Sequence, residues 1–214
     1  MEEQIFSNSE ALPTDAQVVV VGGGIVGAST AYHLGLMGFN DVVLVEQSAL
    51  AGGTTWHAAG MVGRLRTSSS MTKINEYSVK LYSGLEEETG HPVGWKPVGS
   101  LIVARTEARM TQLKRSVALA KYLSIDAMMI SPSEAGEKFS LMRTDDLLGA
   151  AWLPGDGRVD PQGTAEALGI GAQNRGVRII EGVRVTKVLH ENGRVTGVET
   201  TAGTVRAEKV VLAG

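Results

Sequence analysis

A run of four valines followed at once by glycines, residues 18–27 (VVVVGGGIVG), constrains this chain more than any other stretch. Four consecutive β-branched residues disfavour a helix and are typical of a strand buried on both faces of a parallel sheet. The glycines predict a tight turn into a helix. Gly22 permits the bend, Gly24 leaves bare backbone for a pyrophosphate, and Gly27 lets the helix pack closely on the strand. The positive end of that helix favours a phosphate.

The segments that follow complete a dinucleotide-binding pattern. A helix is expected over residues 25–37, and a second buried strand, 42–45, leads directly to Glu46. Glu46 follows Gly22 at close to the spacing of about 20 residues expected for the acid that accepts hydrogen bonds from a ribose hydroxyl. A glycine-rich surface turn would account for the glycines alone. Strand, glycines, helix, strand and acid in this order instead predict an α/β, Rossmann-like fold.

The loop after Glu46 indicates which dinucleotide is bound. Residues 51–60 (AGGTTWHAAG) are mostly small residues and hydroxyls, which can lie along an extended ligand and donate hydrogen bonds to it. A nicotinamide enzyme usually continues into another helix here, whereas FAD bound lengthwise needs a second contact of this kind. The loop therefore favours FAD over NAD.

With this loop the sequence resembles a known family, the FAD-dependent amine dehydrogenases and oxidases of the D-amino-acid-oxidase superfamily, and within it the sarcosine and dimethylglycine dehydrogenases. The resemblance extends over nearly all of the chain beyond residue 16, and GTTWHAAG is its most specific part. The segments that carry it are residues 22–27, 45–47, 53–60, 85–90, 94–95, 154–157 and 160–161.

The resemblance implies a Rossmann-like, two-dinucleotide-binding FAD domain with an inserted, incomplete β-rich substrate domain. Relatives carry roughly as much chain again, and the sarcosine and dimethylglycine enzymes add a folate-binding region, so we expect an N-terminal piece of a longer protein. The expected divisions are an extension at 1–16, the FAD domain at 17–92 and 157–214, and the substrate-domain insertion at 93–156.

Hydrophobic periodicity and turn residues place the other elements. Helices are expected over 71–88, with Ile74, Tyr77, Leu81 and Leu85 on one apolar face, over 107–121 with Met110, Leu113 and Val117 inward, from Ser131-Pro132 onward, and over 161–175. The expected strands are 98–104, 127–130, 147–153 and 177–180, then a meander with turns at 192–193 and 202–203, and a last strand near 210–214.

The resemblance also implies the residues that contact FAD. In that family the histidine of the TWHAAG-like run is bonded covalently to the 8α carbon of the flavin, and the matching residue is His57. A neutral imidazole nitrogen is a nucleophile near neutral pH, which suits this role. Val185 matches a position whose backbone contacts adenine. The implied set is Gly22, Gly24, Ile25, Val26, Gly27, Glu46, Gln47, Gly53, Thr54, Thr55, Trp56, His57, Ala58, Ala59, Gly60, Met61 and Val185.

Two arginines follow the flavin loop. Arg66 lies nine residues after His57, as an arginine does in sarcosine dehydrogenases. A bidentate guanidinium suits the carboxylate of an N-methylated amino acid, so Arg66 is the candidate substrate-binding residue. Alternatively, Arg64 and Arg66 are both solvated or bind the flavin phosphate.

The activity that the resemblance implies is oxidative demethylation of an N-methylated amino acid of the sarcosine or dimethylglycine type. Hydride transfer from the methyl carbon to FAD and hydrolysis would give formaldehyde and the demethylated amine, with an electron-transfer flavoprotein or oxygen as acceptor. No general base or other catalytic side chain can be assigned, because His33, His91 and His190 are each expected to be structural or solvated.

Three alternatives stay open. The first is another flavoenzyme of the superfamily with non-covalent FAD, such as an amine oxidase, a glycine oxidase or a tRNA-modifying flavoprotein. The second is an inactive FAD-binding fragment. An NAD-dependent Rossmann enzyme is the third, and the loop after Glu46 disfavours it.

Composition narrows the possible partners and the compartment. With 20 Lys and Arg against 23 Asp and Glu, the chain offers no basic excess for nucleic acid. The absence of cysteine excludes disulfides, thiolate zinc sites and a cysteinyl flavin in this stretch, and no metal is expected. No apolar run approaches the ~20 residues of a membrane helix, and residues 1–16 match no targeting signal, so a cytoplasmic location is expected, or a mitochondrial one if the source is eukaryotic.

Overall fold

The computed structural model describes residues 11–66 and 68–214. The chain forms two compact units, and each is described by itself. The first contains the described residues up to Ala59 together with 84–94 and 160–214, and the second contains 60–83 and 95–159. Residues 60–83 thus group with the inserted segment, whereas the sequence analysis placed them in the FAD domain. The division into FAD and substrate domains itself remains a proposal.

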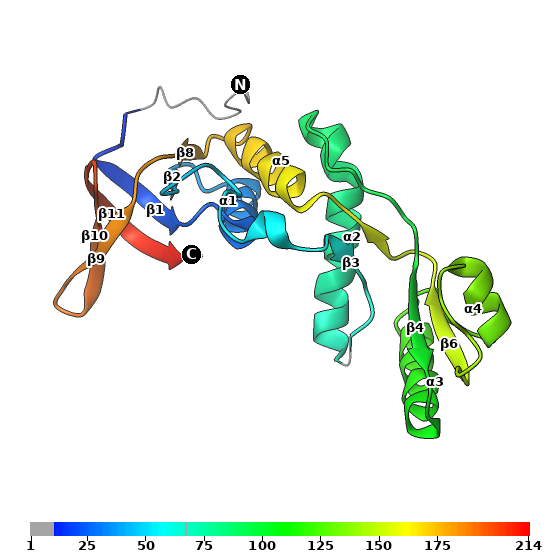
Figure 1. The fold of residues 1–214 in the computed structure, drawn as a ribbon. Helices are drawn as coiled ribbons and strands as arrows, with labels where there is room; N and C mark the ends of the chain where they lie inside the picture. Colours follow the sequence, from blue (N-terminus) through cyan, green and yellow to red (C-terminus); the bar gives the residue numbers. More distant parts are fainter. Residues whose placement is uncertain (1–10, 67) are drawn as a thin grey trace. The chain divides into compact units, whose positions relative to one another are not determined.

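The first unit is built on a six-stranded sheet with the strand order β8-β2-β1-β11-β10-β9 (Figure 1). Strands β8, β2, β1 and β11 run parallel, and β10 is antiparallel to both β11 and β9. The strands expected from the valine runs are confirmed. The bounds are β1 Asp15–Val21, β2 Val42–Val45, β8 Arg178–Ile180, β9 Val185–Glu191, β10 Arg194–Thr200 and β11 Gly203–Leu212.

Both faces of the central strands are covered, which explains why β2 (VVLV) and residues 18–21 of β1 are apolar at every position. On one face, Val19 and Val43 share a core cluster with Val198 and Val205 of the meander. The turn between β9 and β10 has positive φ at Asn192 and Gly193, as a two-residue hairpin turn requires.

Two helices form the other layer of the first unit. Helix α1, Ile25–Leu36, packs on β2 and against α5, Pro161–Gln173, which also contacts β8. Small residues let these helices approach closely, because a methyl group on Gly171 would lie 2.8 Å from the ring of Tyr32. Side-chain alternation along β1 directs Val18 and Val20 to the face opposite Val19.

The second unit contains a three-stranded antiparallel sheet with the order β4-β6-β5. Helix α3 packs on this sheet with Leu113 and Val117 buried and Met110 partly buried, as expected. Ser131 and Glu134 form a capping box at the start of α4, which confirms the predicted helix start. The bounds are β4 Ser100–Ala104, β5 Met128–Ile130, β6 Gly149–Leu153, α3 Glu107–Tyr122 and α4 Pro132–Lys138.

Two details differ from the sequence-based predictions. Helix α2, Ser69–Thr89, forms as expected, but Ile74 is 57% and Tyr77 46% exposed while Leu85 is fully buried, because only part of the apolar face is covered. Residues 157–158, for which the sequence analysis expected no strand, form the short strand β7, Gly157–Arg158, antiparallel to β3, Met61–Val62. Within residues 11–66 and 68–214, no helix combines the length and apolar character needed to span a bilayer.

Candidate functional site

The glycine turn joins β1 to α1 at the carboxyl edge of the parallel strands. Gly22 has φ +104°, a conformation that residues with side chains rarely adopt. A methyl group on Gly27 would overlap the carbonyl oxygen of Gly22, so this helix can lie so close to the turn only with glycine there. Gly24 is the N-cap of α1 and provides no side chain to cover the helix end. The turn therefore exposes backbone where an anion can approach.

The loop that contains GTTWHAAG is held against this turn by Thr55. Its Oγ1 accepts a hydrogen bond from the backbone N–H of Ile25 at 3.0 Å and would lie 3.2 Å from a methyl group on Gly24. Residues 55–57 form a single 3₁₀ turn, η1, which packs on α5. The structure thus brings together the two stretches that the sequence analysis assigned to the cofactor.

Glu46 extends the same site from the end of β2. Its Oε2 accepts the Gly23 N–H at 2.6 Å, and its Oε1 accepts the Ser48 N–H at 2.8 Å. These two bonds to the backbone were not predicted from the sequence, and the predicted bond from Glu46 to a ribose hydroxyl stays a prediction. An ionised carboxylate has about four acceptor positions, so Glu46 can hold the turn and still accept from a ligand.

The outer side of the loop is open to solvent. Trp56 is 53% exposed, and its ring stacks on that of His57 with centroids 3.7 Å apart. Apart from its chain neighbours, no atom of the described residues lies within 4 Å of the position that a methyl group on Gly53 would take, and Val26 in the first turn of α1 is exposed. A helix end whose N-cap residue has no side chain, an acid able to accept hydrogen bonds from hydroxyls, and an open loop with an exposed ring system fit an extended dinucleotide such as FAD.

The other predicted cofactor residues lie in different parts of the structure. Gln47, Thr54, Ala58 and Ala59 are exposed positions of the first unit beside the residues described above. Val185 lies in β9 with its side chain against the core cluster of the sheet. Gly60 and Met61 belong to the second unit.

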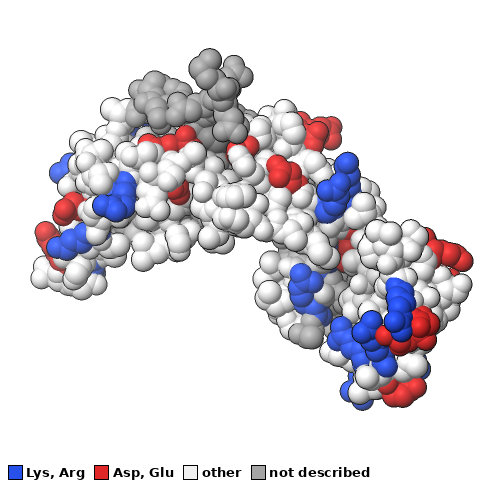
Figure 2. Space-filling view, viewed as in Figure 1, with Lys and Arg blue, Asp and Glu red and all other residues white. Residues whose placement is uncertain are grey.

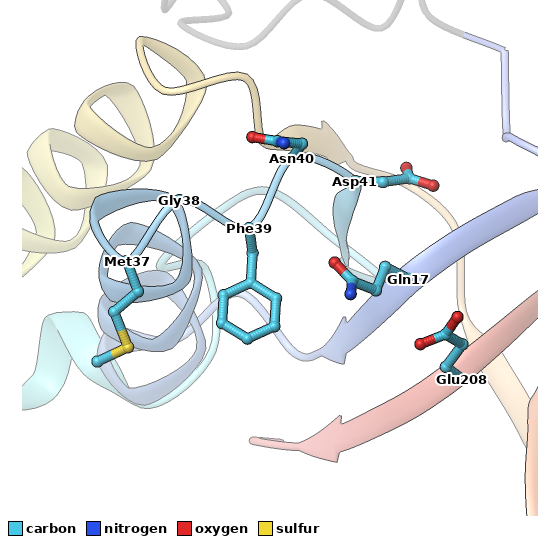
Figure 3. Close-up of a pocket in the computed structure, with 7 residues that line it drawn as sticks. All are labelled: Gln17, Met37, Gly38, Phe39, Asn40, Asp41 and Glu208. Atoms are coloured by element: carbon cyan, nitrogen blue, oxygen red, sulfur yellow. The ribbon is translucent and has the colours of Figure 1, made fainter.

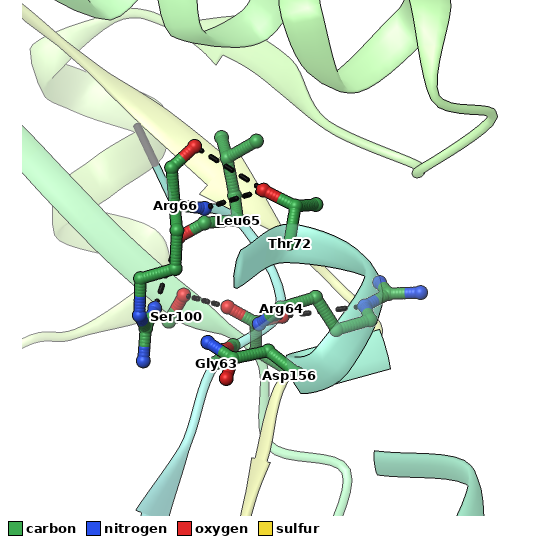
Figure 4. A network of polar contacts seen from close by, with 8 residues as sticks. Gly63, Arg64, Leu65, Arg66, Thr72, Ser100 and Asp156 are labelled. Atoms are coloured by element: carbon green, nitrogen blue, oxygen red, sulfur yellow. Dashed lines mark hydrogen bonds and ion pairs between the residues drawn. The ribbon is translucent and has the colours of Figure 1, made fainter. Parts of the chain in front are cut away.

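Arg64 and Arg66 of the second unit have different surroundings (Figure 4). The Arg64 N–H and Nε donate to Oδ1 of Asp156 at 3.1 and 3.4 Å, and Asp156 Oδ2 accepts from Ser100 Oγ at 2.6 Å. The Asp156 side chain is only 4% exposed. Arg64 Nη2 is buried and, within the part of the chain that the structure describes, has no hydrogen-bond partner.

Arg66 is the freer of the two arginines. Its side chain is exposed and its Nη1 donates to the carbonyl oxygen of Leu65 at 2.9 Å, so it is bonded to backbone rather than to an acid. Thr72 Oγ1 accepts the Arg66 N–H at 3.0 Å and anchors the backbone there. Of the two predicted candidates, Arg66 is therefore the one available to an anionic ligand.

Sequence reasoning missed Glu181, which follows β8. Its Oε1 accepts the Leu50 N–H at 2.5 Å, across 131 residues of sequence. Burial raises the pKa of the Glu181 carboxyl, the Leu50 hydrogen bond lowers it, and the nearby carboxylates of Glu46 and Glu166 raise it further. A signal was available, because Glu181 follows a buried strand just as Glu46 does.

The histidines outside the loop have structural partners or lie on the surface. His33 Nδ1 lies 2.6 Å from the carbonyl oxygen of Ser29 within α1, and His91 Nε2 lies 3.0 Å from Glu166 Oε2. His190 is exposed in β9. No three His, Asp or Glu side chains in the described residues gather into a group that could hold a metal ion.

One hollow on the first unit lies away from this site. It has a volume of about 480 Å³ and lies near the amino ends of β1 and β2, at the edge opposite the glycine turn (Figure 3). It is lined by Gln17, Met37, Gly38, Phe39, Asn40, Asp41 and Glu208. On the face drawn in Figure 2, basic and acidic side chains are interspersed, so that face shows no basic track of the kind that binds nucleic acid.

The sequence matches the family described as FAD dependent oxidoreductase (DAO) over residues 17–214. It is 39% identical to human mitochondrial sarcosine dehydrogenase, over 95% of this chain and 23% of that protein. It is also 39% identical to 4-methylaminobutanoate oxidase (formaldehyde-forming) of Paenarthrobacter nicotinovorans, over 97% of this chain and 25% of that protein. The mitochondrial pyruvate dehydrogenase phosphatase regulatory subunit of Mus musculus is 42% identical over 96% of this chain and 23% of its own length.

The chain spans about a quarter of the length of these relatives. Among solved structures, L-proline dehydrogenase from P. horikoshii matches with a TM-score of 0.88 at 28% identity, over 94% of this chain and 53% of that one. Glycine oxidase from Bacillus cereus matches with a TM-score of 0.77 at 28% identity, over 93% and 55%.

Proposed function

This chain belongs to the DAO family of FAD-dependent oxidoreductases, and on that premise we propose that its protein binds FAD and oxidatively demethylates a small N-methylated amino acid of the sarcosine or dimethylglycine type. The observation that carries the proposal is the Thr55–Ile25 hydrogen bond, which seats the GTTWHAAG loop on the glycine turn. The proposal is supported by three relatives at 39% identity, which are a sarcosine dehydrogenase, a dimethylglycine dehydrogenase and a 4-methylaminobutanoate oxidase.

The residues of the first unit would divide the binding of FAD among them. Gly24 and the amino end of α1 receive the pyrophosphate, because backbone N–H groups and the helix dipole favour an anion there. Glu46 accepts hydrogen bonds from the ribose hydroxyls while it holds Gly23. His57, exposed and stacked on Trp56, would be the residue that tethers the flavin covalently. Bound FAD supplies the oxidising chemistry, accepting a hydride from the N-methyl carbon.

Arg66 in the second unit would bind the substrate carboxylate. A guanidinium matches a carboxylate in two parallel hydrogen bonds, and the exposed guanidinium of Arg66 donates to the Leu65 carbonyl oxygen rather than to an acid. Arg64 instead donates its Nε to Asp156, and Asp156 also accepts the Arg64 backbone N–H and so holds the backbone next to Arg66. The proposed electron acceptor is an electron-transfer flavoprotein or oxygen, and the proposed location is cytoplasmic, or mitochondrial in a eukaryotic source.

A second candidate function follows from one of the relatives. The phosphatase regulatory subunit, 42% identical over 96% of this chain, is named as a regulatory subunit and not as an oxidoreductase. The second candidate is therefore a protein in which this unit binds FAD but does not oxidise an amine. The two candidates share the FAD site and differ in whether an amine substrate reduces the flavin.

The experiment is anaerobic mixing of the full-length natural protein, loaded with FAD, with sarcosine, dimethylglycine or 4-methylaminobutanoate. Loss of the oxidised flavin absorbance with one of these and release of formaldehyde on reoxidation are the expected results. Glycine serves as the control substrate, because it lacks the N-methyl group; bleaching by glycine alone would indicate a glycine oxidase. FAD that no amine reduces would favour the non-catalytic candidate.

A further inference from the structure

We propose that Glu181 is a positioning residue for the FAD site: its carboxylate fixes the loop from Glu46 to Gly53 by accepting the Leu50 N–H, and it thereby sets the affinity for FAD. The inference rests on the proposed function in one respect, since it takes the Gly22–Glu46 edge as the place where FAD binds. Glu181 is not among the residues that the sequence analysis assigned to FAD.

Glu181 and Glu46 stand side by side at the carboxyl edge of the sheet. Val45 of β2 pairs with Ile180 of β8, and the Glu46 N–H continues this ladder by donating to the Ile180 carbonyl oxygen at 2.9 Å. The Val183 N–H then donates to the Glu46 carbonyl oxygen at 3.0 Å. The segment after β8 is thus joined to the segment after β2 by backbone bonds, and Glu181 adds a side-chain bond.

Leu50 transmits this bond to the glycine turn. Its side chain is buried, and its Cδ1 would lie 2.9 Å from a methyl group on Gly23. The next residue, Ala51, donates its N–H to the Gly23 carbonyl oxygen at 2.9 Å. Because Ala51 has φ +61°, which is unfavourable for a residue with a side chain, its conformation must be imposed by the bonds on either side.

The loop then runs from Ala51 through Gly53 to Thr55, which caps Ile25 at the first turn of α1. The loop is therefore fixed at both ends of residues 50–55, by Glu181 through Leu50 and by Thr55 through Ile25. Release of the Leu50 end frees Ala51 to leave its unfavourable conformation. The peptide groups that face the cofactor would then have to be ordered again on binding, at a cost in affinity.

The surroundings of Glu181 argue against a role in stability alone. Its pKa is raised by burial and by two like charges, Glu46 from the end of β2 and Glu166 from α5. Glu166 is itself bonded to His91 Nε2 and to Gln162. The Leu50 hydrogen bond opposes this rise, and perturbed carboxylates gather at functional sites, which agrees with the geometric argument above.

The test is a FAD titration, followed by flavin fluorescence, of the full-length protein carrying His57→Ala, so that no covalent bond can form. Glu181→Ala in this background is expected to raise the Kd about tenfold, as for loss of one hydrogen bond to a charged group. Glu181→Gln retains an oxygen acceptor for Leu50 and is expected to raise it by at most about threefold. The rate of hydrogen exchange at the Leu50 amide should rise in Glu181→Ala and not in Glu181→Gln.

Glu86→Ala is the matched control, because Glu86 also accepts a backbone N–H in the first unit, that of Val93 at 3.1 Å, and does not touch the loop. It should leave the Kd unchanged. The inference on Glu181, but not the proposed function, would be overturned by any of three results. These are an unchanged Kd in Glu181→Ala, a Kd in Glu181→Gln raised as much as in Glu181→Ala, or a Kd in Glu86→Ala raised as much as in Glu181→Ala. A parent protein that bound no FAD would overturn the proposed function, and this inference with it.

Discussion

The hydroxyl of Thr55 accepts a hydrogen bond from the backbone N–H of Ile25 at 3.0 Å, joining residues 30 positions apart in the sequence. Through this contact the loop after β2 becomes part of the helix end that follows β1. The loop and the glycine turn, the two parts of the candidate FAD site, are therefore joined by the protein's own hydrogen bond.

Thr55→Ala should lower the free energy of unfolding by about 1 kcal/mol, because it leaves a helix N–H without its cap. FAD affinity should fall as well, since the loop loses its attachment to the glycine turn. Urea denaturation and FAD titration measure the two effects. Thr55→Ser keeps the hydroxyl and is the control; if Thr55→Ser lost as much as Thr55→Ala, the hydrogen bond would not be the cause.

Gly27→Ala should destabilise the first unit by about 1–3 kcal/mol or more, because its methyl group would overlap the Gly22 carbonyl oxygen and push α1 from the turn. Gly84→Ala in α2 provides the matched control. Outside its own helix backbone and chain neighbours, no described atom lies within 4 Å of its added methyl group, and helix propensity favours alanine there by up to about 1 kcal/mol. Thermal unfolding of both variants checks this, and equal effects would contradict the packing argument.

Asp156→Ala should cost about 3–5 kcal/mol, because it leaves the Arg64 guanidinium buried without its acid and removes the acceptor of Ser100 Oγ. The exposed pair Arg143–Asp145 is the comparison, and Asp145→Ala should change stability by less than about 1 kcal/mol. Denaturant unfolding followed by Trp152 or another probe in the second unit gives both values. A small loss for Asp156→Ala would mean that water replaces the acid.

The pH dependence of stability should reveal Glu181. Because its folded pKa lies above the ordinary value of 4.5, the folded state binds more protons than the unfolded state between these two values. Stability from this group is therefore highest below pH 4.5 and falls as pH rises through the folded pKa. Wild type should lose stability relative to Glu181→Gln over that window and then run parallel to it. A constant difference at all pH values would show that the pKa is not raised.

Much of the fold is predictable because it depends on local chemistry. The valine strands, the Asn192–Gly193 turn and the capping box at Ser131 each follow from the conformational preferences of a few neighbouring residues. The glycine turn and Glu46 also follow, since their spacing is imposed by a strand, a helix and a second strand.

What could not be predicted depends on which segments meet in space. The bond from Leu50 to Glu181 requires knowing that β8 lies beside β2, and the Arg64–Asp156 pair requires the pairing of β3 with β7. The exposure of Ile74 had no local sign, because periodicity reveals an apolar face but not what covers it. The roles of His57, Arg66 and Val185 remain proposals, because each depends on contacts with a bound ligand and not on neighbouring residues in the sequence.

The central claim, that this loop and turn bind FAD with His57 as the tether, is tested most directly by acid precipitation of the full-length protein and of His57→Ala. Flavin that stays in the wild-type pellet and moves to the supernatant in the variant is the predicted result. Flavin free in the supernatant of both would contradict the tether and favour a non-covalent oxidase. A folded wild-type protein with no flavin in either fraction, even after incubation with FAD, would contradict the claim itself.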